Sequence, residues 1–299
     1  GALSTATQTG SSAFGASADA TGVNSTALGA YSTANAAEAT AVGETSQATA
    51  AGATAVGSDT LASGISSVAI GDNAQATLDG AIAIGGNAIA AGTHATATGF
   101  DSNAAGEHST ATGSHTDAIG NYSTATGSYS QAIGNDSTAT GAYSTAVGNF
   151  STANGAFANA AVDFGTAVGA YSDATGTDST ALGSYSQATG NYSTAVGNGA
   201  IASNDQSTAV GESSSATGTE STAIGQGANA SGDDSVAVGQ GSTASGLYST
   251  AVGEQATAGG TFSSAFGNDS DASGNNSTAL GTYSTASGNN STTTGYNSA

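Results

Sequence analysis

The side chains of this chain that could bind a metal or transfer a proton are mainly three histidines and 21 acidic residues, because its 299 residues contain no Lys, Arg or Cys. The spacing from His94 to His108 equals the spacing from Asp101 to His115, and both match the period with which glycine recurs along the chain. In a structure with this period, each pair shares one edge, where His and Asp side chains could hold zinc. Acidic turns could offer oxygen ligands to calcium, but they lack the spacing of a calcium-binding loop. No nucleophile is paired with an orienting base, so we expect no metal, no cofactor and no enzymatic activity.

The charge of the chain excludes several classes of partner. A formal net charge of −21 without a single Lys or Arg repels nucleic acids and anionic lipid surfaces. The absence of cysteine excludes disulfides and thiolate metal sites. The sequence contains no run of about 18 apolar residues that would predict a membrane span, and Gly1 is not followed by a signal segment. We therefore expect a mature chain or a fragment that does not insert directly into a membrane.

Glycine and alanine recur along the chain with a strict period. Glycine occupies every fourteenth position from Gly1 to Gly295, and alanine occupies every seventh position from Ala6 to Ala286, with no insertion. Low charge with many Gly and Ser residues is otherwise typical of a disordered linker, but such a linker has no reason to keep this register. A short fixed period without insertions indicates a solenoid, in which each repeat forms one coil stacked on the previous coil.

Each repeat consists of two seven-residue halves of the form S-x-A-x-G-x-x, as in STALGAY at residues 25–31. The first five residues alternate as in a strand, with Ser, Ala and Gly on one face and the two variable residues on the other. The last two residues form a turn, in which Gly, Asn and Asp supply permissive backbone dihedrals. The sequence predicts one all-β domain over residues 1–299, a parallel solenoid of about 21 coils, each with two short strands, spaced about 4.8 Å apart.

The strict alanines distinguish the inside of the coil from the outside. Methyl groups from both strands leave no room for larger side chains between them, so the alanine face is the interior. On the outer face, the strand that ends at the invariant glycines carries an apolar residue, whereas the opposite strand carries polar pairs such as Asp19 with Thr21. Together with Phe14, these apolar positions are Leu28, Val42, Val56, Ile70, Ile84, Val168, Leu182, Val196, Val210, Ile224, Val238, Val252, Phe266 and Leu280.

A single solenoid of this composition buries little apolar surface. Ordering one coil costs on the order of 20 kcal/mol, and two alanines per coil contribute only a small amount of burial. A continuous apolar stripe on the outer surface is also larger than monomers tolerate. We therefore expect the apolar positions to pack against identical chains around a symmetry axis, which creates a core between chains.

Several segments resemble a known family. NSTALG (24–29), ISSVAIGDNAQA (65–76), GDDSVAVGQGSTASG (232–246) and GNNSTALGTYSTASG (274–288) are similar to the head repeats of trimeric autotransporter adhesins, the YadA-like head. The resemblance covers essentially the whole chain. It implies a left-handed parallel β-roll, a homotrimer, the outer surface of a bacterium, and adhesion to host matrix, cells or other surfaces. The apolar positions named above match the family's trimer-facing positions.

The chain departs from the family pattern in three ways. The S-V-A-I-G strand of the family is mostly S-T-A-Φ-G here, with Val or Ile kept only at Val68, Ile82 and Val236. No neck, heptad stalk or membrane anchor is recognisable, so we expect anchoring in the outer membrane through parts outside this chain. The apolar position also changes strand near residues 91–161, where Thr98, Thr112, Thr126, Thr140 and Asn154 replace it and Ile119, Ile133 and Val147 appear on the opposite strand.

This half-repeat shift has two explanations. A slip by half a repeat leaves a polar interval in the core between chains. Alternatively, the solenoid contacts partners through both faces, which favours a filament or a lateral bundle. The same interval carries threonine pairs on one face, from Thr96 with Thr98 to Thr138 with Thr140. Regular threonine arrays on flat β-solenoids resemble ice-binding surfaces, although threonine is also simply favourable in strands.

Aromatic and histidine side chains gather at one position of the repeat, two residues after the glycine position. Residues one repeat apart lie one coil apart, so we expect ladders along the two edges of the solenoid. Such ladders either stiffen the turns or bind glycans and protein side chains. The predicted ladders contain Tyr129, Tyr143, Phe157, Tyr171 and Tyr185 on one edge, and His94, His108 and Tyr122 on the other.

The sequence thus favours a non-enzymatic extracellular adhesin head on a bacterial cell surface. Its expected partners are further copies of the same chain, and an extracellular matrix protein, a glycan or another surface ligand held by many weak contacts. Nucleic acid is not an expected partner. A self-assembling filament subunit and an ice-binding solenoid are the alternative functions.

Overall fold

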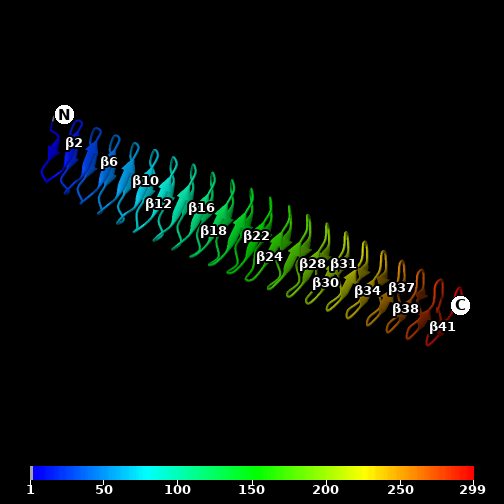
Figure 1. Cartoon of the computed structure of the whole chain (residues 1–299). Coiled ribbons are helices and arrows are strands. Elements are labelled where there is room, and N and C mark those ends of the chain that lie inside the picture. The colour runs from blue at the N-terminus through cyan, green and yellow to red at the C-terminus, as the bar shows by residue number, and fades with distance from the viewer. Residues whose placement is uncertain (1–2) are drawn as a thin grey trace. The chain divides into compact units, whose positions relative to one another are not determined.

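The computed structural model describes residues 3–299, and the regular secondary structure of these residues consists of strands. The chain forms two compact units, one reaching to Phe150 and one from Ser151 to Ala299. In each unit, every repeat of the sequence forms one coil with two short strands, and successive coils stack side by side (Figure 1). The predicted parallel solenoid with one coil per repeat is confirmed in each unit. A single domain, a left-handed winding and three-chain assembly stay predictions.

Each unit contains two parallel sheets, which we call the three-residue sheet and the two-residue sheet after the length of their strands. In the first unit, the three-residue sheet contains β2 (Ser12–Phe14), β4 (Thr26–Leu28), β6 (Thr40–Val42), β8 (Thr54–Val56), β10 (Val68–Ile70), β12 (Ile82–Ile84), β14 (Thr96–Thr98), β16 (Thr110–Thr112), β18 (Thr124–Thr126) and β20 (Thr138–Thr140). The two-residue sheet contains β1 (Thr5–Ala6), β3 (Asp19–Ala20), β5 (Thr33–Ala34), β7 (Gln47–Ala48), β9 (Leu61–Ala62), β11 (Gln75–Ala76), β13 (Ile89–Ala90), β15 (Asn103–Ala104), β17 (Asp117–Ala118), β19 (Gln131–Ala132) and β21 (Thr145–Ala146).

The second unit repeats this arrangement. Its three-residue sheet contains β22 (Thr152–Asn154), β24 (Thr166–Val168), β26 (Thr180–Leu182), β28 (Thr194–Val196), β30 (Thr208–Val210), β32 (Thr222–Ile224), β34 (Val236–Val238), β36 (Thr250–Val252), β38 (Ser264–Phe266), β40 (Thr278–Leu280) and β41 (Thr292–Thr294). Its two-residue sheet contains β23 (Asn159–Ala160), β25 (Asp173–Ala174), β27 (Gln187–Ala188), β29 (Ile201–Ala202), β31 (Ser215–Ala216), β33 (Asn229–Ala230), β35 (Thr243–Ala244), β37 (Thr257–Ala258) and β39 (Asp271–Ala272).

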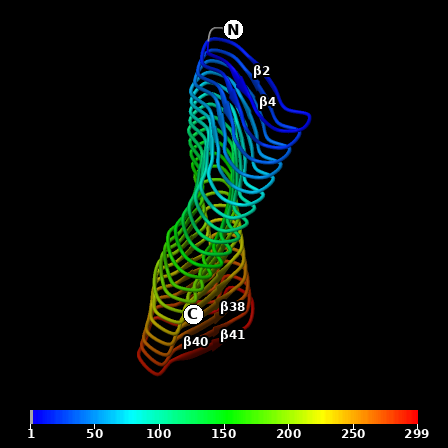
Figure 2. The same ribbon diagram turned by 90° about the vertical axis from the view of Figure 1, so that its left-hand side faces the viewer.

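Strand pairing keeps one register within each unit. Each strand pairs in parallel with the equivalent strand one coil away, so that Leu28 of β4 lies beside Val42 of β6 and Thr33 of β5 lies beside Gln47 of β7. Any residue therefore lies next to the residue one repeat later. Figure 2 shows the coils of each unit as narrow loops that turn slightly from one to the next, as the twist of parallel strands requires.

The two strands of a coil are unequal, which the alternation of five residues in each half did not predict. On the two-residue side, the N–H groups of Thr21 and Gly22 both donate to the carbonyl oxygen of Ala34, at 3.1 and 3.3 Å. The residue after each two-residue strand, such as Thr21 or Ile119, lies between the end of the strand and the bend of the turn.

Alanine and serine line the interior, as predicted. Ala27 and Ala34 face each other from the two strands of one coil and are almost fully buried. Serine at the inner corners is also buried, and the Oγ of Ser144 donates to the carbonyl oxygen of Gly141 at 2.8 Å. Small side chains on both strands leave the coil too thin to enclose a cavity for a ligand, so the surfaces of the coil must carry its function.

The two glycine positions of each coil differ in their backbone. Gly183, at the invariant position, has φ +136°, and a β-carbon there would lie 2.4 Å from the carbonyl oxygen of Gly197. L-residues rarely adopt this backbone conformation, which explains why every coil keeps glycine there. Gly190, half a repeat later, lies outside the left-handed region, and equivalent positions accept Ala36, Leu78 and other residues.

Candidate binding surfaces

Each coil has two turns, and the third residue of each turn, which we call the tip, has a left-handed backbone. Tyr31 is the tip of the turn after a three-residue strand, and Glu38 is the tip of the turn after a two-residue strand. Their φ values are +58° and +61°, and the other non-glycine tips fall between +51° and +61°. The same backbone in every coil places the side chains of tips one repeat apart in register. Bulky residues are uncommon at positive φ, so their frequency at the tips needs a compensating interaction.

Stacked rings supply that interaction in the first unit. His94 stacks on His108 with ring centroids 5.0 Å apart, and His108 stacks on Tyr122 at 5.2 Å. On the other edge, Tyr129 stacks on Tyr143 at 4.9 Å, with the ring planes within 4° of parallel. The structure thus brings these predicted ladder residues together.

The second ladder begins earlier than the residue spacing alone was taken to predict. His115 stacks on Tyr129 at 4.7 Å, and Phe100 meets the His115 ring edge-on at 5.6 Å. His115 lies one repeat before Tyr129, and this spacing was sufficient to predict that the two rings stack. Phe100 could not be found in this way, because it lies one residue before the tip of its turn.

The second unit contains two further stacks. Tyr171 stacks on Phe157 at 4.8 Å and on Tyr185 at 5.0 Å, with interplanar angles of 6° and 2°. Tyr248 and Phe262 form a separate pair at 5.0 Å. The predicted ladder members Phe157, Tyr171 and Tyr185 therefore lie in one stack.

Stacking determines what a ladder can offer to a ligand. Parallel rings at about 5 Å cover each other's faces, so rings inside a stack present their edges and hydroxyl groups. A face becomes accessible only at the end of a stack. Tyr185 is such an end, because the tip one coil later is Gly199, and Tyr185 is 57% exposed. A role of the ladders in binding stays a prediction.

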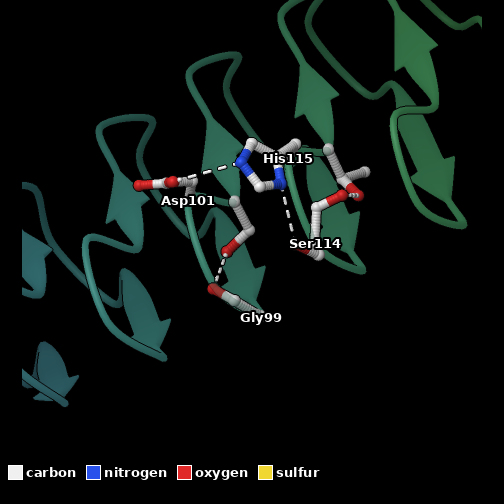
Figure 3. A network of polar contacts seen from close by, with 6 residues as sticks. Gly99, Asp101, Ser114 and His115 are labelled. Carbon is white, nitrogen blue, oxygen red and sulfur yellow. Dashed lines mark hydrogen bonds and ion pairs between the residues drawn. The ribbon is translucent and has the colours of Figure 1, made fainter.

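One polar network lies beside the second ladder (Figure 3). The Oγ of Ser114 is 2.8 Å from Nδ1 of His115, and Oδ2 of Asp101 is 3.3 Å from Nε2 of the same ring. From the sequence we expect no hydroxyl group beside an oriented base, and this arrangement differs from that expectation. Serine, histidine and aspartate occur in this order in hydrolases, which work in sites that exclude water. Here the network lies on a surface turn, where the side chains of His115 and Asp101 are 40% and 35% exposed to water, and its contacts fix the orientation of a ring within a stack.

Acidic residues remain dispersed over the surface. In the described part of the chain, residues 3–299, no three His, Asp or Glu side chains come together as metal ligands. The contacts between His and carboxylates are pairs, His115 with Asp101 and His108 with Glu107 at 3.7 Å. The same residues include no helix long and apolar enough to cross a membrane.

The predicted interface residues form an exposed apolar column on the three-residue sheet of each unit. They occupy the last residue of their strands, and from β4 onward the middle alanine of these strands is buried, so the residues of the column point outward. Leu28 and Ile224 are 44% and 41% exposed, and the valines at this position are half-buried. The column is absent from β14 to β20, where the equivalent residues are Thr98, Thr112, Thr126 and Thr140, paired in register.

A ladder of side-chain amides was not found by sequence reasoning. The Oδ1 of Asn121 accepts a hydrogen bond from the backbone N–H of Glu107 at 2.9 Å, and the Oδ1 of Asn135 accepts one from the N–H of Asn121 at 3.0 Å. Asn275 and Asn289 act in the same way in the second unit. The recurrence of asparagine at intervals of one repeat could have predicted this ladder. These bonds join successive coils at the turn.

The chain is similar to known proteins both in its sequence repeats and among solved structures. The sequence model described as "YadA head domain repeat (2 copies)" matches residues 6–32, 20–43, 34–60, 62–88, 90–116, 118–136, 125–151, 174–200, 202–228, 216–242, 244–270 and 272–298. Among solved structures, the chain is similar to the crystal structure of the collagen-binding domain of the Yersinia adhesin YadA, at 21% identity and a TM-score of 0.21, over 62% of this chain and 67% of that one. No curated protein matches the sequence.

Proposed function

The chain belongs to the family of YadA head domain repeats, and from this premise we propose that it is the head of a bacterial surface adhesin. Membership of this family supports a role in attachment. In this proposal, the head lies outside the cell, on the surface of a bacterium whose outer membrane anchors the protein. It binds surfaces without catalysing a reaction.

The observation that carries this proposal is the apolar column on the three-residue sheet. Val196, Val210 and Ile224 lie on adjacent strands of the second unit and point away from the alanine core. A column of this length, left in water, exceeds the apolar patches of ordinary monomers. Three copies of the chain that pack these columns around one axis remove them from water and leave the two-residue sheets outside.

Attachment in this proposal depends on many weak contacts. The repeat presents similar turn edges in every coil, and three chains present each edge three times. Contacts that are individually weak then sum to firm binding. The ladder residues, with the open ring face at Tyr185, are the proposed contact points for an extracellular matrix protein or a glycan.

Solution mass and adhesion test the proposal separately. We expect light scattering to give the mass of three chains over a wide range of concentrations, and the double substitution Val196→Asp with Val210→Asp to reduce it to one chain. Beads coated with the intact head should adhere to matrix-protein or glycan surfaces, and beads coated with the one-chain variant should adhere more weakly. A wild-type mass of one chain, or equal adhesion by both proteins, contradicts the proposal.

Two other functions have an observation in their favour. The outward apolar residues Ile119, Ile133 and Val147 favour a filament subunit, for which the mass should rise without limit as concentration increases. The in-register threonine pairs of β14 to β20 favour ice binding, for which the chain should produce thermal hysteresis.

A further inference from the structure

Three branched aliphatic residues form a short row on the two-residue sheet of the first unit. Ile119, Ile133 and Val147 directly follow strands β17, β19 and β21, and they are 44%, 40% and 41% exposed. They are one repeat apart, so they lie on neighbouring coils at about 4.8 Å. The equivalent position of every other coil in the chain carries Thr, Ser, Asn, Ala or Gly.

The fold of the unit does not require this row. Ala118, Ala132 and Ala146, immediately before the three residues, are fully buried, so the alternation of the strand directs the row outward. Coils with a hydroxyl group at this position, such as the one that contains Thr77, form the same turns and the same pairing. The inference rests on the proposed function in one respect, since packing of the three-residue sheets between chains leaves this row on the outer surface of the assembly.

Two carboxylates lie beside the row. Asp117 lies two residues before Ile119 on the same outward face, and its two oxygens accept hydrogen bonds from Asn103 at 3.2 Å and Gln131 at 3.5 Å. These neutral amides orient the carboxylate and leave its charge uncompensated. Asp136 is the tip of the turn that follows Ile133.

An aromatic face accompanies the second carboxylate. Tyr122 is the tip one coil before Asp136, it is 56% exposed, and one of its faces is covered by His108. Its other face is directed toward the coil of Asp136. A cation beside Asp136 can therefore interact with a carboxylate and with a tyrosine ring at the same time.

From these features we propose that the row of Ile119, Ile133 and Val147, with Asp117 and Asp136, binds an extended cationic segment of a partner protein in which apolar residues alternate with Lys or Arg. The aliphatic side chains of the row take the apolar residues of the segment, and the carboxylates take its cations. An extended segment presents alternate side chains to a surface, so its apolar residues contact the row, and the long side chains of its Lys or Arg residues bend from the other face to the carboxylates beside the row.

Charge selects this partner over others. Asp117 and Asp136, in a chain of net charge −21 with no Lys or Arg, repel any polyanion that approaches the row, and the same row of a second copy offers them no opposite charge. The same charge attracts a cationic segment and speeds its association. The apolar row then distinguishes an amphipathic segment from a merely basic one.

The test compares the intact chain with a variant in which the three residues of the row are replaced by threonine, the residue that several other coils carry at this position. Ile119→Thr, Ile133→Thr and Val147→Thr, combined, place at the row the residue found at Thr77, Thr175 and Thr189. The probe is a labelled dodecapeptide of alternating Leu and Lys, and the control peptide alternates Ser and Lys. Fluorescence anisotropy at physiological salt should show binding of the Leu-Lys peptide at least tenfold weaker for the variant, and weak binding of the Ser-Lys peptide to both proteins.

A matched variant controls for the loss of apolar residues in general. Leu61→Thr, Ile89→Thr and Ile201→Thr, combined, remove three apolar side chains from the two-residue sheets outside the row, and the affinity for the Leu-Lys peptide should stay within twofold of wild type. Asp117→Asn with Asp136→Asn changes no apolar residue and should weaken binding about threefold or more, which keeps the proposal testable if the threonine variant fails to fold.

Equal affinity of the wild type and the threonine variant for the Leu-Lys peptide overturns the proposal, because charge alone then explains binding. It is also overturned if the wild type, without peptide, has a greater mass than the threonine variant, because a second copy then covers the row. The mass of the wild type and of the threonine variant tests the proposed function on the same samples, and we expect three chains for both. Light scattering therefore reports whether the chains assemble, and fluorescence anisotropy reports whether the row binds the peptide.

Discussion

At the scale of single residues, the tips of the turns combine strain with stacking. Tyr171 has φ +57° and Tyr192 has φ +57°, although the left-handed region is unfavourable by about 1–2 kcal/mol for residues with a β-carbon. Tyr171 stacks on a ring on each side. Tyr192 has Asp178 and Gln206 at the tips before and after it. The two tyrosines therefore share a strained backbone but differ in what compensates for it.

Substitution of each tyrosine by glycine separates strain from stacking. Tyr192→Gly should stabilise its coil by about 1 kcal/mol, because glycine relieves the backbone strain. Tyr171→Gly relieves the same strain but loses two stacked pairs of about 0.5–1.5 kcal/mol each, so its coil should be less stable than that of the Tyr192 variant by about 1–3 kcal/mol. Hydrogen exchange of the tip amides, which donate to Ala156 and Thr177, measures the local free energy of opening.

Equal changes in opening free energy at the two sites contradict the role given to stacking. Phe164 and Phe150 are unsuitable controls because they have ring or polar contacts of their own. Tyr31, whose neighbouring tips are Ser17 and Thr45, is the matched control, and Tyr31→Gly should resemble Tyr192→Gly.

At the scale of the coil, the two glycine positions control how closely successive coils approach. At Gly183 the obstacle is the backbone conformation as well as the neighbouring carbonyl group. At Gly190 a β-carbon would lie 2.0 Å from the carbonyl oxygen of Asn204, yet the chain itself carries Ala36, Ala50, Val162 and Asn204 at equivalent positions. A coil can therefore adjust at the second position and cannot adjust at the first.

Alanine substitution at these two glycines should have very different effects. Gly183→Ala places a β-carbon on a backbone of φ +136°, and it should lower the free energy of unfolding by about 3–5 kcal/mol. Gly190→Ala should lower it by about 1 kcal/mol or less. Urea unfolding followed by circular dichroism measures both variants. This explanation is contradicted if Gly190→Ala lowers the free energy of unfolding more than Gly183→Ala does.

The coil could be predicted from the sequence because its causes are local and repeated. Strict alanine specified a narrow interior, strict glycine specified the turns, and residues one repeat apart could be placed side by side, which gave the stacks around Tyr129 and Tyr171. The unequal strands could not be predicted, since both halves of the repeat alternate in the same way and their strands still differ in length. The contact of Phe100 with His115 and the pairing of Ser114 with His115 also depend on side-chain directions that spacing does not specify.

At the scale of the whole molecule, the first unit carries two different outer surfaces. From β2 to β12 its three-residue sheet presents an apolar column, and from β14 to β20 it presents threonine instead. If three chains pack through this sheet, the threonine interval lies in the core between chains, where a hydroxyl group without a partner is unfavourable by about 1–3 kcal/mol. The assembly should therefore be weakest at this interval.

Restoring the apolar column tests this expectation. Thr112→Val with Thr126→Val places on β16 and β18 the residue that β6 and β8 carry at the same position. In the proposed assembly the change should raise stability by about 1 kcal/mol per chain at each site, and the melting temperature of the three-chain species should increase. The control, Thr175→Val with Thr189→Val, alters the position after the two-residue strands β25 and β27, which stays in water, and should leave the melting temperature unchanged. Scanning calorimetry at two protein concentrations, with the mass checked by light scattering, measures the effect. No increase for the first pair, or an equal increase for both pairs, means that the three-residue sheet does not face the sister chains.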